Sequence, residues 1–560
     1  MIPPQAPVMT PPAADSGALS GIEDAINGFF EPVATFLTAV VFYAIPLPGG
    51  VSLPIVVIWL VAAGIIISAY FGFIQFRGFK LAVEVVRGKF SRDDDPGEIT
   101  HFQALSSALS GTVGLGNIAG VGAALALGGA GATFWMIICG LLGMATKFAE
   151  CTLGVKYRTV NEDGTVSGGP FKYLPVAFGR FGKVPAAILT GAFAIAIFFF
   201  GVGGGNMFQA NQTFAQAREV TGGADGFLGS DGSALVFGLA LAGLIGAVIL
   251  GGIKSIATVT SKLVPIMGLG YVAACLMVIA SNISHVPSAF GEILSGAFTP
   301  EAGLGGLVGV LIVGFQRAAF SNEAGLGSAP IAHSAVKTTR PVSEGFVALL
   351  EPFIDTVIIC TMTALTIIIA NPPSWREGIE GVKAGDGPPD GVLLTSDAFA
   401  TFLPQFPVIL AVMVGLFAFS TLLTWSYYGE KAWEYFFGYS KPSIMLYKLI
   451  FVTFTVVGTI LTFGRVLEIT DAFLFICGFI NLLGLYFLLP ELKSEMAAYM
   501  ADRKSGRLYE LGAADEAELQ AIREEHGNTG ELPKMQSESA HDSGLTMEER
   551  AREGARHNIE

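Results

Sequence analysis

Two short stretches place glycine and polar residues inside apolar segments, and both have the composition of an ion or small-molecule site. GTVGLGNIAG covers residues 111–120, and FSNEAGLGSAP covers residues 320–330. Glycine inside a helix costs about 1 kcal/mol per residue relative to alanine, so each stretch predicts an interrupted helix. An interruption leaves free carbonyl groups on one half-helix and free N–H groups on the other. These ends suit a cation and an anion, respectively, and together fit a zwitterion beside a monovalent cation.

The glycines of the first stretch have two interpretations. Gly114 and Gly116 would allow a small ligand to approach the main chain. Small residues in membrane helices also allow close helix packing, which is the interpretation we assign to Gly122, Gly140 and Gly143. We favour the ligand interpretation for residues 111–117 because a second interruption occurs later in the chain.

Ionisable residues within apolar segments are candidates for function. Asp355, in EPFIDTVIICT, is the strongest single acid, either as a contact for a substrate amine or a cation, or as an acceptor for Thr356 or a backbone group. Arg317 and Glu323 flank the second interruption, where a pair could brace it or form a gate. Lys147 and Glu150 lie three residues apart, a spacing at which they can neutralise each other.

Uncharged polar residues in other apolar segments add further candidates. Thr421, together with Ser420 in FAFSTLLTW, offers hydroxyls of the kind that complete a sodium site. The alternative is a bond from the hydroxyl to the carbonyl four residues earlier. Gln209 and Asn211, in GGGNMFQANQ, are expected either to line a pathway or to bridge helices.

The elements that position these residues are predicted to be membrane-spanning helices. Of 560 residues, 52% are hydrophobic and only 14% are charged, whereas soluble domains average about 25% charged residues. At about 20 residues per span, we expect an all-α polytopic membrane protein with about eleven transmembrane helices. The predicted spans are residues 54–76, 103–127, 132–155, 184–214, 233–250, 263–282, 303–336, 345–370, 407–428, 443–462 and 471–490.

The flanking regions are predicted to lie outside this transporter-like core at 54–490. Residues 1–53 form an N-terminal segment with a possible interfacial helix at 21–45, and residues 491–560 form a charged, solvated tail. Most Lys and Arg of the connecting loops follow odd-numbered spans. The positive-inside rule then places the N-terminus outside and the tail in the cytoplasm.

The two interruptions occupy equivalent places in two halves of the core. Residues 103–282 contain five predicted spans and begin with the first interrupted one, and residues 303–490 contain five that begin with the second. The predicted orientation makes the two interrupted helices run in opposite directions. This pattern indicates an inverted-repeat secondary transporter, with the span at 54–76 as an extra helix.

Long motifs around these residues resemble the alanine or glycine:cation symporter family, also described as sodium:alanine symporters or amino acid carrier proteins. The motifs are GTVGLGNIAGVGAALALGGAGATFWM, GMATKFAECTLGVKYR, GGIKSIATVTSKLVPIM, RAAFSNEAGLGSAPIAHSAVKT and FAFSTLLTWSYYGEK. The resemblance covers about residues 54–490. It implies a leucine-transporter type of five-plus-five fold with two discontinuous helices, and sodium-coupled uptake of alanine or glycine.

The resemblance also implies a set of binding residues. Substrate and cation contacts would come from Thr112, Gly114, Gly116, Asn117, Ser321, Asn322, Gly325 and Thr421, with sodium near Gly114, Asn117 and Thr421. The chain departs from the family pattern at Ala130, Ala318 and Ile480. The alanine at 318 adds a methyl group beside the second interruption and could narrow the choice of substrate.

We therefore expect a multi-pass protein of the bacterial inner membrane that imports small neutral amino acids with sodium by alternating access. Its partners would be the amino acid, the sodium ion and the bilayer, and a monomer would suffice. We expect no enzyme activity and no cofactor, because the sequence has no phosphate loop, GxSxG or HExxH motif, and no nucleic-acid partner. The alternatives are a proton-coupled transporter that uses Asp355 or Glu323, and a channel or sensor.

Overall fold

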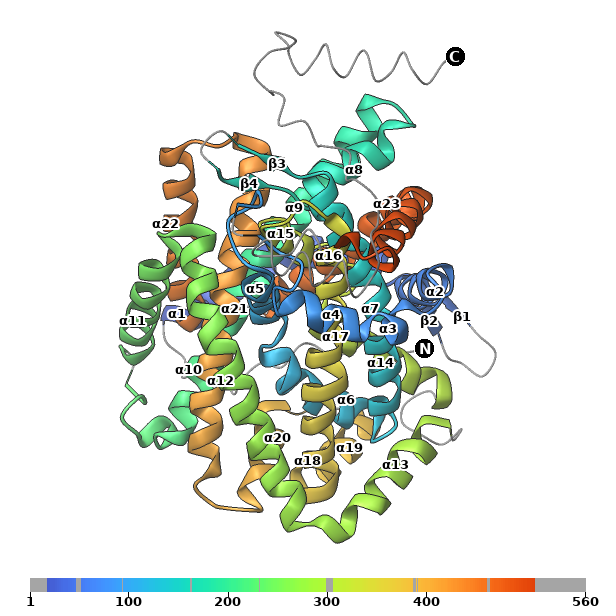
Figure 1. Cartoon of the computed structure of the whole chain (residues 1–560). Helices are drawn as coiled ribbons and strands as arrows, with labels where there is room; N and C mark the ends of the chain where they lie inside the picture. Colours follow the sequence, from blue (N-terminus) through green and yellow to red (C-terminus); the bar gives the residue numbers. More distant parts are fainter. Residues whose placement is uncertain are drawn as a thin grey trace, which may run out of the picture. The chain divides into compact units, whose positions relative to one another are not determined.

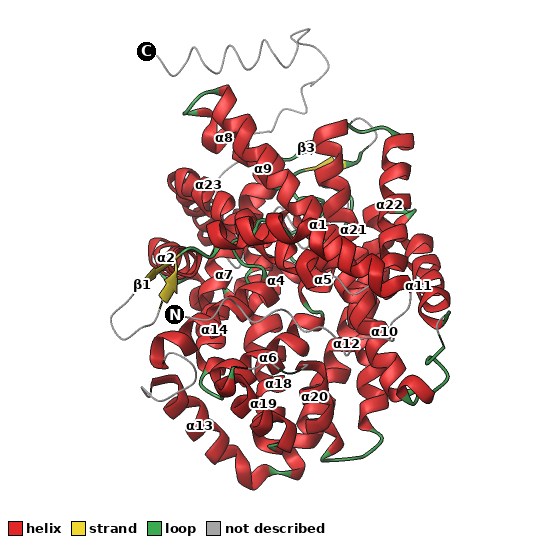
Figure 2. Ribbon diagram, turned by 180° about the vertical axis from the view of Figure 1, so that it is seen from behind, coloured by secondary structure: helices red, strands yellow, loops and turns green. Residues whose placement is uncertain are grey.

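The structure, a computed structural model, describes residues 18–46, 52–92, 94–161, 164–230, 232–298, 306–385, 389, 391–460 and 464–508. The chain divides into two compact units, Met1–Met496 and Ala497–Glu560. The described part of the second unit is the end of one long helix and a short turn after it. All predicted site residues lie in the first unit, which consists almost entirely of helices (Figures 1 and 2).

The first third of the described chain leads from the N-terminal helix through the first interruption. Two short strands, β1 (Ala44–Pro46) and β2 (Ser52–Pro54), form an antiparallel pair before the second helix. The helices of this part are α1 (Ala18–Val41), α2 (Ile55–Tyr70), α3 (Ile74–Arg77), α4 (Phe79–Val86), α5 (His101–Thr112), the 3-10 turn η1 (Leu115–Asn117), α6 (Ala119–Gly128) and α7 (Ala132–Lys156).

The middle part contains a second antiparallel pair of strands and one helix that is locally widened. The strands are β3 (Thr159–Val160) and β4 (Val166–Ser167). The helices are α8 (Pro170–Gly179), α9 (Lys183–Val202), the π-helix η2 (Gly203–Met207), α10 (Phe208–Val220), the 3-10 turn η3 (Gly223–Asp225), α11 (Ser233–Ile249), α12 (Gly252–Ser281), the 3-10 turn η4 (Ile283–His285) and α13 (Val286–Phe298).

The last part begins with the second interrupted segment. Its helices are α14 (Gly306–Asn322), α15 (Ala329–His333), α16 (Pro341–Ala348), α17 (Leu350–Pro352), the π-helix η5 (Phe353–Cys360), α18 (Thr361–Ala370), α19 (Pro373–Ala384), α20 (Gly391–Ala400), α21 (Phe406–Phe437), α22 (Lys441–Ile460) and α23 (Gly464–Lys504).

Every predicted span coincides with one or more of these helices. Within the described residues, seven helices are long and apolar enough to cross a membrane, and a bent pair raises the number to eight. Three predicted spans correspond to shorter apolar helices, Ile55–Tyr70, Ser233–Ile249 and Gly306–Asn322. The chain is therefore mostly helical with seven to eight apolar spans, and the count of eleven stays a prediction.

Several helices lie in segments that the sequence pattern left as connections. The segment 371–406 contains α19 and α20, and α13 follows α12 after one 3-10 turn. Close contact explains α20: a Cβ on Gly122 of α6 would lie 2.4 Å from Gly391 O. A helix that packs against the main chain of its neighbour is selected by tertiary contact, which hydrophobic periodicity alone does not reveal.

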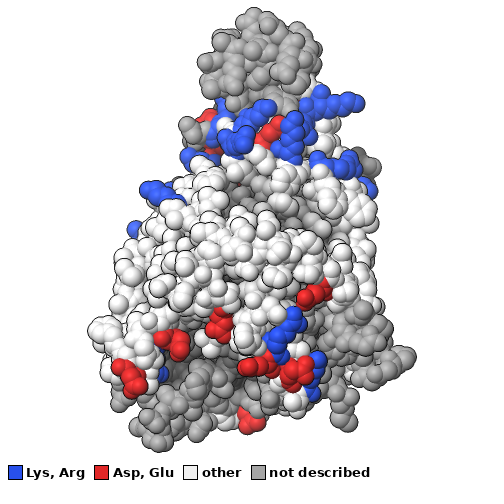
Figure 3. Space-filling model, turned by 90° about the horizontal axis from the view of Figure 1, so that it is seen from below, with Lys and Arg blue, Asp and Glu red and all other residues white. Residues whose placement is uncertain are grey.

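The surface of the protein has the charge distribution of a membrane protein. Figure 3 shows Lys and Arg gathered at one end of the visible face, Asp and Glu mostly at the other end, and a broad band without charges between them. Large apolar side chains such as Leu244, Ile266 and Leu269 are exposed. Such exposure is unfavourable in water but suits contact with lipid.

Candidate functional site

The first interruption separates α5 from α6 and is built around Gly114. The two helical parts, His101–Thr112 and Leu115–Gly128, meet at an angle of 60°. A Cβ on Gly114 would lie only 2.6 Å from Thr421 Oγ1 of α21, so glycine is required for this close approach. The N–H of Gly114 donates to Asn117 Oδ1 at 2.8 Å. Asn117 thus replaces a hydrogen bond that the interrupted helix lacks.

The second interruption lies between the end of α14 at Asn322 and the start of α15 at Ala329. Its backbone turns through positive φ at Glu323 (54°), Gly325 (89°) and Gly327 (79°). The carboxylate of Glu150 in α7 accepts hydrogen bonds from Gly325 N at 3.2 Å and Gly327 N at 2.8 Å. One buried carboxylate therefore supplies acceptors for two N–H groups that have left the helix.

Lys147 and Glu150 act on each other electrostatically, in agreement with the prediction, but their direct contacts are made with other groups. Lys147 Nζ lies 2.9 Å from Glu351 Oε1, and both side chains are fully buried. Glu150 also accepts from Asn481 Nδ2 at 2.5 Å. The two residues are near in sequence, but they act on different elements: Lys147 binds α17, whereas Glu150 holds the second interruption.

Asp355 connects the two interruptions through a network of hydrogen bonds. Its Oδ1 accepts from Asn117 Nδ2 at 2.7 Å, and its Oδ2 accepts from Ser321 Oγ at 2.9 Å and Thr356 Oγ1 at 2.7 Å. Asn117 Nδ2 is also 3.0 Å from Ser321 Oγ. We call Asn117, Ser321, Asp355 and Thr356 the Asp355 network.

The π-helix η5 presents Asp355 to this network. A π-helical turn contains one extra residue per hydrogen-bonded ring and occurs often at functional sites. Asp355 is fully buried, and its described hydrogen-bond donors, Asn117, Ser321 and Thr356, are all uncharged. A buried carboxylate without a cation is unfavourable, so the network has the electrostatic character of a cation site.

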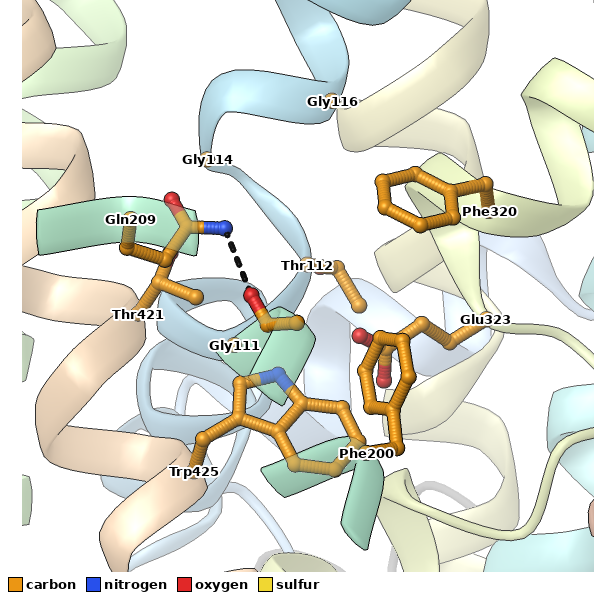
Figure 4. A pocket seen from close by; sticks show the side chains of 11 residues that line it. Gly111, Thr112, Gly114, Gly116, Phe200, Gln209, Phe320, Glu323, Thr421 and Trp425 are labelled. Carbon is orange, nitrogen blue, oxygen red and sulfur yellow. Dashed lines mark hydrogen bonds between the residues drawn. The ribbon is translucent and has the colours of Figure 1, made fainter. Parts of the chain in front are cut away.

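A partly open cavity lies next to the Asp355 network, with about 290 Å³ of space free of protein atoms when the adjoining solvent is counted. Six predicted residues line it, from both interruptions, α10 and α21: Thr112, Gly114, Gly116, Gln209, Glu323 and Thr421. Figure 4 shows Gln209 and Glu323 on opposite sides of the cavity, with the main chain of Gly114 and Gly116 along one edge. The cavity therefore presents an amide, a carboxylate and exposed main chain to a small molecule.

Gln209 has an acceptor that no protein group uses. Its Nε2 donates to Gly204 O at 3.3 Å, which is the bond drawn in Figure 4. Its Oε1 is buried and has no hydrogen-bond partner in the described structure. A buried unpaired acceptor costs about 1–3 kcal/mol, so this oxygen favours a ligand with an N–H donor.

Aromatic rings that the sequence analysis did not select close the rest of the cavity. They are Phe200, Phe320 and Trp425, and the remaining lining residues are Gly111 and Gly204. A signal was present for Trp425, because it lies four residues after Thr421 and so on the same face of a helix. The ring centroids of Phe200 and Trp425 lie 4.6 Å apart in an edge-to-face contact. The rings fix the shape of the cavity on the side that faces Gly114 in Figure 4.

Thr421 lies at the cavity and also makes the intrahelical bond that we considered as its alternative. Its Oγ1 donates to Phe417 O at 3.0 Å. Ser420 does not line the cavity; it bonds to Phe417 O at 2.9 Å, and its carbonyl accepts from Ser110 Oγ at 2.6 Å. Ser420 thus joins α21 to α5, and only Thr421 is available to a ligand.

The other predicted residues lie around these two places. Asn322 donates to Thr356 Oγ1 at 3.0 Å and accepts from Ala324 N at 3.0 Å, so it stabilises the second interruption. Asn211 is on α10 but is not part of the cavity lining. Glu323 accepts from Ser328 Oγ at 2.5 Å. The acid that acts on Arg317 is Asp471 of α23, so the brace predicted between Arg317 and Glu323 is not the contact observed.

Comparison with known proteins identifies the family of the chain. Residues 45–512 match the family model described as the sodium:alanine symporter family. The sodium/alanine symporter AgcS of Methanococcus maripaludis is 40% identical over 455 residues, which cover 81% of this chain and 95% of that protein. The putative sodium/proton-dependent alanine carrier protein YrbD of Bacillus subtilis is 32% identical over 468 residues, which cover 81% of this chain and 91% of that protein.

A solved structure, MhsT in complex with L-phenylalanine, aligns with a TM-score of 0.47 and 13% identity over 77% of this chain and 97% of that chain. The sequence relationships are decisive, because the family match extends over both interruptions, Asp355 and the whole cavity. This multi-pass membrane protein belongs to the sodium:alanine symporter family.

Proposed function

We propose that the protein is a sodium-coupled symporter that imports small neutral amino acids, alanine, glycine or both, by alternating access. The observation that carries this proposal is the fully buried Asp355, whose described hydrogen-bond donors are all uncharged and which lies beside a cavity formed by two interrupted helices. A carboxylate in this position binds a cation, and the neighbouring cavity binds the amino acid.

We place the sodium ion in the Asp355 network. Sodium takes oxygen ligands, as hard cations do, and Asp355 and Ser321 offer three such atoms within one hydrogen-bonded group. Asn117 would contribute its Oδ1 after rotation of the amide, which releases the Gly114 N–H that it now accepts. The sodium site expected near Gly114, Asn117 and Thr421 is thereby divided between two places. Asn117 belongs to the proposed sodium site, whereas Thr421 lines the cavity.

We place the amino acid in the cavity. Its ammonium group would donate to the unpaired Gln209 Oε1 and to Glu323, and its carboxylate would face the main chain at Gly114 and Gly116. Phe200, Phe320 and Trp425 would surround the side chain and restrict it to a small group such as a hydrogen, a methyl or a hydroxymethyl group. The Gly114 N–H released from Asn117 would link the two sites, because sodium binding then frees a donor for the substrate carboxylate.

The transport cycle uses the two half-helix pairs as moving parts. We propose that residues 103–282 and 303–490 form inverted repeats, with the N-terminus outside and the tail in the cytoplasm of a bacterial cell. The charge separation in Figure 3 supports this orientation. At a membrane potential of about 100 mV, one sodium ion supplies roughly 2.3 kcal/mol to uptake before any concentration gradient.

The test is uptake of radiolabelled alanine into proteoliposomes that contain the full chain. With an inward sodium gradient, uptake should pass transiently above equilibrium, and an equal potassium gradient should not produce this effect. Glycine or serine should compete, and leucine should not. Because coupling is reciprocal, saturating sodium should raise the affinity for alanine by the same factor by which saturating alanine raises the affinity for sodium.

The variant Asp355→Asn separates the proposed mechanism from its alternatives. It should abolish stimulation by sodium while the protein stays folded. The matched control is Glu430→Gln, which removes another buried, ion-paired carboxylate that lies 3.2 Å from Lys448 and does not line the cavity. Uptake that is driven by a pH gradient and does not depend on sodium would show that the coupling ion is a proton. Flux that is neither saturable nor concentrative would favour a channel, and absence of uptake would favour a sensor.

A further inference from the structure

A cluster of five buried ionisable side chains lies outside both the cavity and the Asp355 network. His101 begins α5, His333 ends α15, and Glu344, Glu351 and Lys147 belong to α16, α17 and α7. Each is at most 2% exposed. Five helices therefore bring buried ionisable groups together, and such groups are stable only when they are paired.

Glu344 is the centre of this cluster. Its Oε2 is hydrogen-bonded to Nδ1 of His101, and its Oε1 to Nδ1 of His333. An ionised carboxylate only accepts hydrogen bonds, so both imidazoles donate from Nδ1. Hydrogen bonds to an ionised acceptor are roughly twice as strong as neutral ones. One side chain thus ties the first residue of α5 to the last residue of α15.

The cluster continues to α7 through Glu351. His333 Nε2 lies 3.6 Å from Glu351 Oε2, and Lys147 Nζ lies 2.9 Å from Glu351 Oε1. Lys147 supplies the positive charge opposite Glu351. Other ionisable groups that act on the cluster include Glu150 and Cys151 of α7, Glu323, Asp355 of η5, Tyr428 of α21 and Arg158 after α7.

Arg158 makes a second tie at the same end of the half-helices. Its guanidinium donates to four carbonyl groups, those of Pro96 and Thr338 at 2.6 and 2.8 Å and those of Ser334 and Val336. Burial lowers the pKa of Arg158, yet arginine stays charged in proteins. The segment before α5 and the segment after α15 are therefore held together by main-chain contacts as well as by Glu344.

The four helices α5, α7, α15 and α16 pack tightly behind these ties. Ala108, Cys151, Ala329 and Ala348, one from each helix, form a buried apolar group. A Cβ on Gly154 of α7 would lie 2.7 Å from Pro330 Cβ of α15. Cys151 is fully buried in this group, so its thiol can react only when the helices separate.

We infer that Glu344, through His101 and His333, is the positioning residue that keeps α5 and α15 together at the ends of these two helices that lie away from the interruptions. α5 and α15 are the half-helices of the two interrupted segments, and on the orientation proposed above their tied ends face the cytoplasm. The contact must open for the substrate to leave on that side. This inference rests on the proposed function, since it states that these contacts close the cytoplasmic side of the protein in one state of the transport cycle.

The test measures the reactivity of Cys151, which needs no transport activity. The full chain in inside-out membrane vesicles is treated with a membrane-impermeant maleimide, and modified peptides are quantified by mass spectrometry. Glu344→Gln should increase the rate of Cys151 modification at least tenfold, and His101→Ala, which cuts one of the two ties, should increase it less. Cys139, a buried cysteine in a different apolar cluster, is the internal reference and should not change.

Two further measurements separate this role from general loosening of the fold. Glu430→Gln should leave the reactivity of Cys151 within twofold of the wild type. In Glu344→Gln the concentration of external alanine for half-maximal uptake should rise, because fewer molecules face outward, and Glu344→Asp should restore part of the difference. If Glu344→Gln does not fold, His101→Ala carries the same comparison.

The inference is overturned if Cys151 reacts at the wild-type rate in folded Glu344→Gln and His101→Ala proteins, or if Glu430→Gln raises the rate equally. Failure of the proposed function would look different, since the wild-type protein would then show no sodium-driven uptake whatever the reactivity of Cys151.

Discussion

Asn117 and Asp355 are 238 positions apart in the sequence and are joined by a 2.7 Å hydrogen bond from Asn117 Nδ2 to Asp355 Oδ1. The same Asn117 accepts from Gly114 N at 2.8 Å. One amide therefore contacts the proposed cation site with one atom and the edge of the substrate cavity with the other. This connection provides a direct physical route between the proposed cation site and the proposed substrate cavity.

The variant Asn117→Leu tests this route. Leucine has a similar volume but neither donates to Asp355 nor accepts from Gly114. We expect the sodium concentration for half-maximal alanine uptake to rise at least tenfold, and the enhancement of alanine affinity by sodium to fall. Binding of each ligand, measured with and without the other, gives the coupling factor directly. An unchanged coupling factor in a folded variant would exclude Asn117 from the route.

The variant Gly114→Ala tests the close approach at the first interruption. The new methyl group would lie 2.6 Å from Thr421 Oγ1, so α21 or the interruption must move. We expect alanine affinity to fall at least tenfold. Gly120→Ala is the matched control, since a Cβ there meets no atom within 4 Å. Combining Gly114→Ala with Thr421→Ala removes the clash, and the two losses should then be less than additive.

The variant Trp425→Leu tests whether the rings limit the size of the substrate. A smaller side chain at this wall should admit larger amino acids, so valine and leucine should begin to inhibit alanine uptake. One methylene in an apolar pocket changes discrimination about 10–200-fold, and we expect a shift within that range. Trp433→Phe is the control, because Trp433 is on the same helix as Trp425 but donates to Ser443 Oγ of α22 at 2.8 Å and does not line the cavity. Unchanged selectivity in Trp425→Leu would assign size selection elsewhere.

The sequence predicted the parts of the site that carry a local signal. Gly114, Asn117 and Ser321 stand out as polar or flexible residues in apolar surroundings, and all three are at the interruptions. Asp355 stands out as an acid in an apolar run. Each of these residues is unusual among its sequence neighbours, so it can be identified without knowledge of contacts to distant segments.

The parts that the sequence did not predict depend on contacts between distant segments. Glu150 looked like half of a pair with Lys147, and only the fold brings it to Gly325 and Gly327. Phe200 is one apolar residue among many in α9, and only its position at the cavity gives it a role. Glu344 immediately precedes the predicted span 345–370, a position where a charged residue is usually exposed to solvent. In the structure it is fully buried.

The variant Glu150→Gln tests whether the α7 carboxylate holds the second interruption in shape. Glutamine has one acceptor oxygen, whereas Glu150 Oε2 and Oε1 serve Gly325 N and Gly327 N separately. At least one buried N–H group then loses its partner, at a cost of about 1–3 kcal/mol. We expect a lower midpoint of thermal unfolding in detergent. The exposed Glu380→Gln, which breaks a surface pair with Lys383 at 2.9 Å, should change it little. Equal midpoints for the two variants would show that the interruption keeps its shape without Glu150.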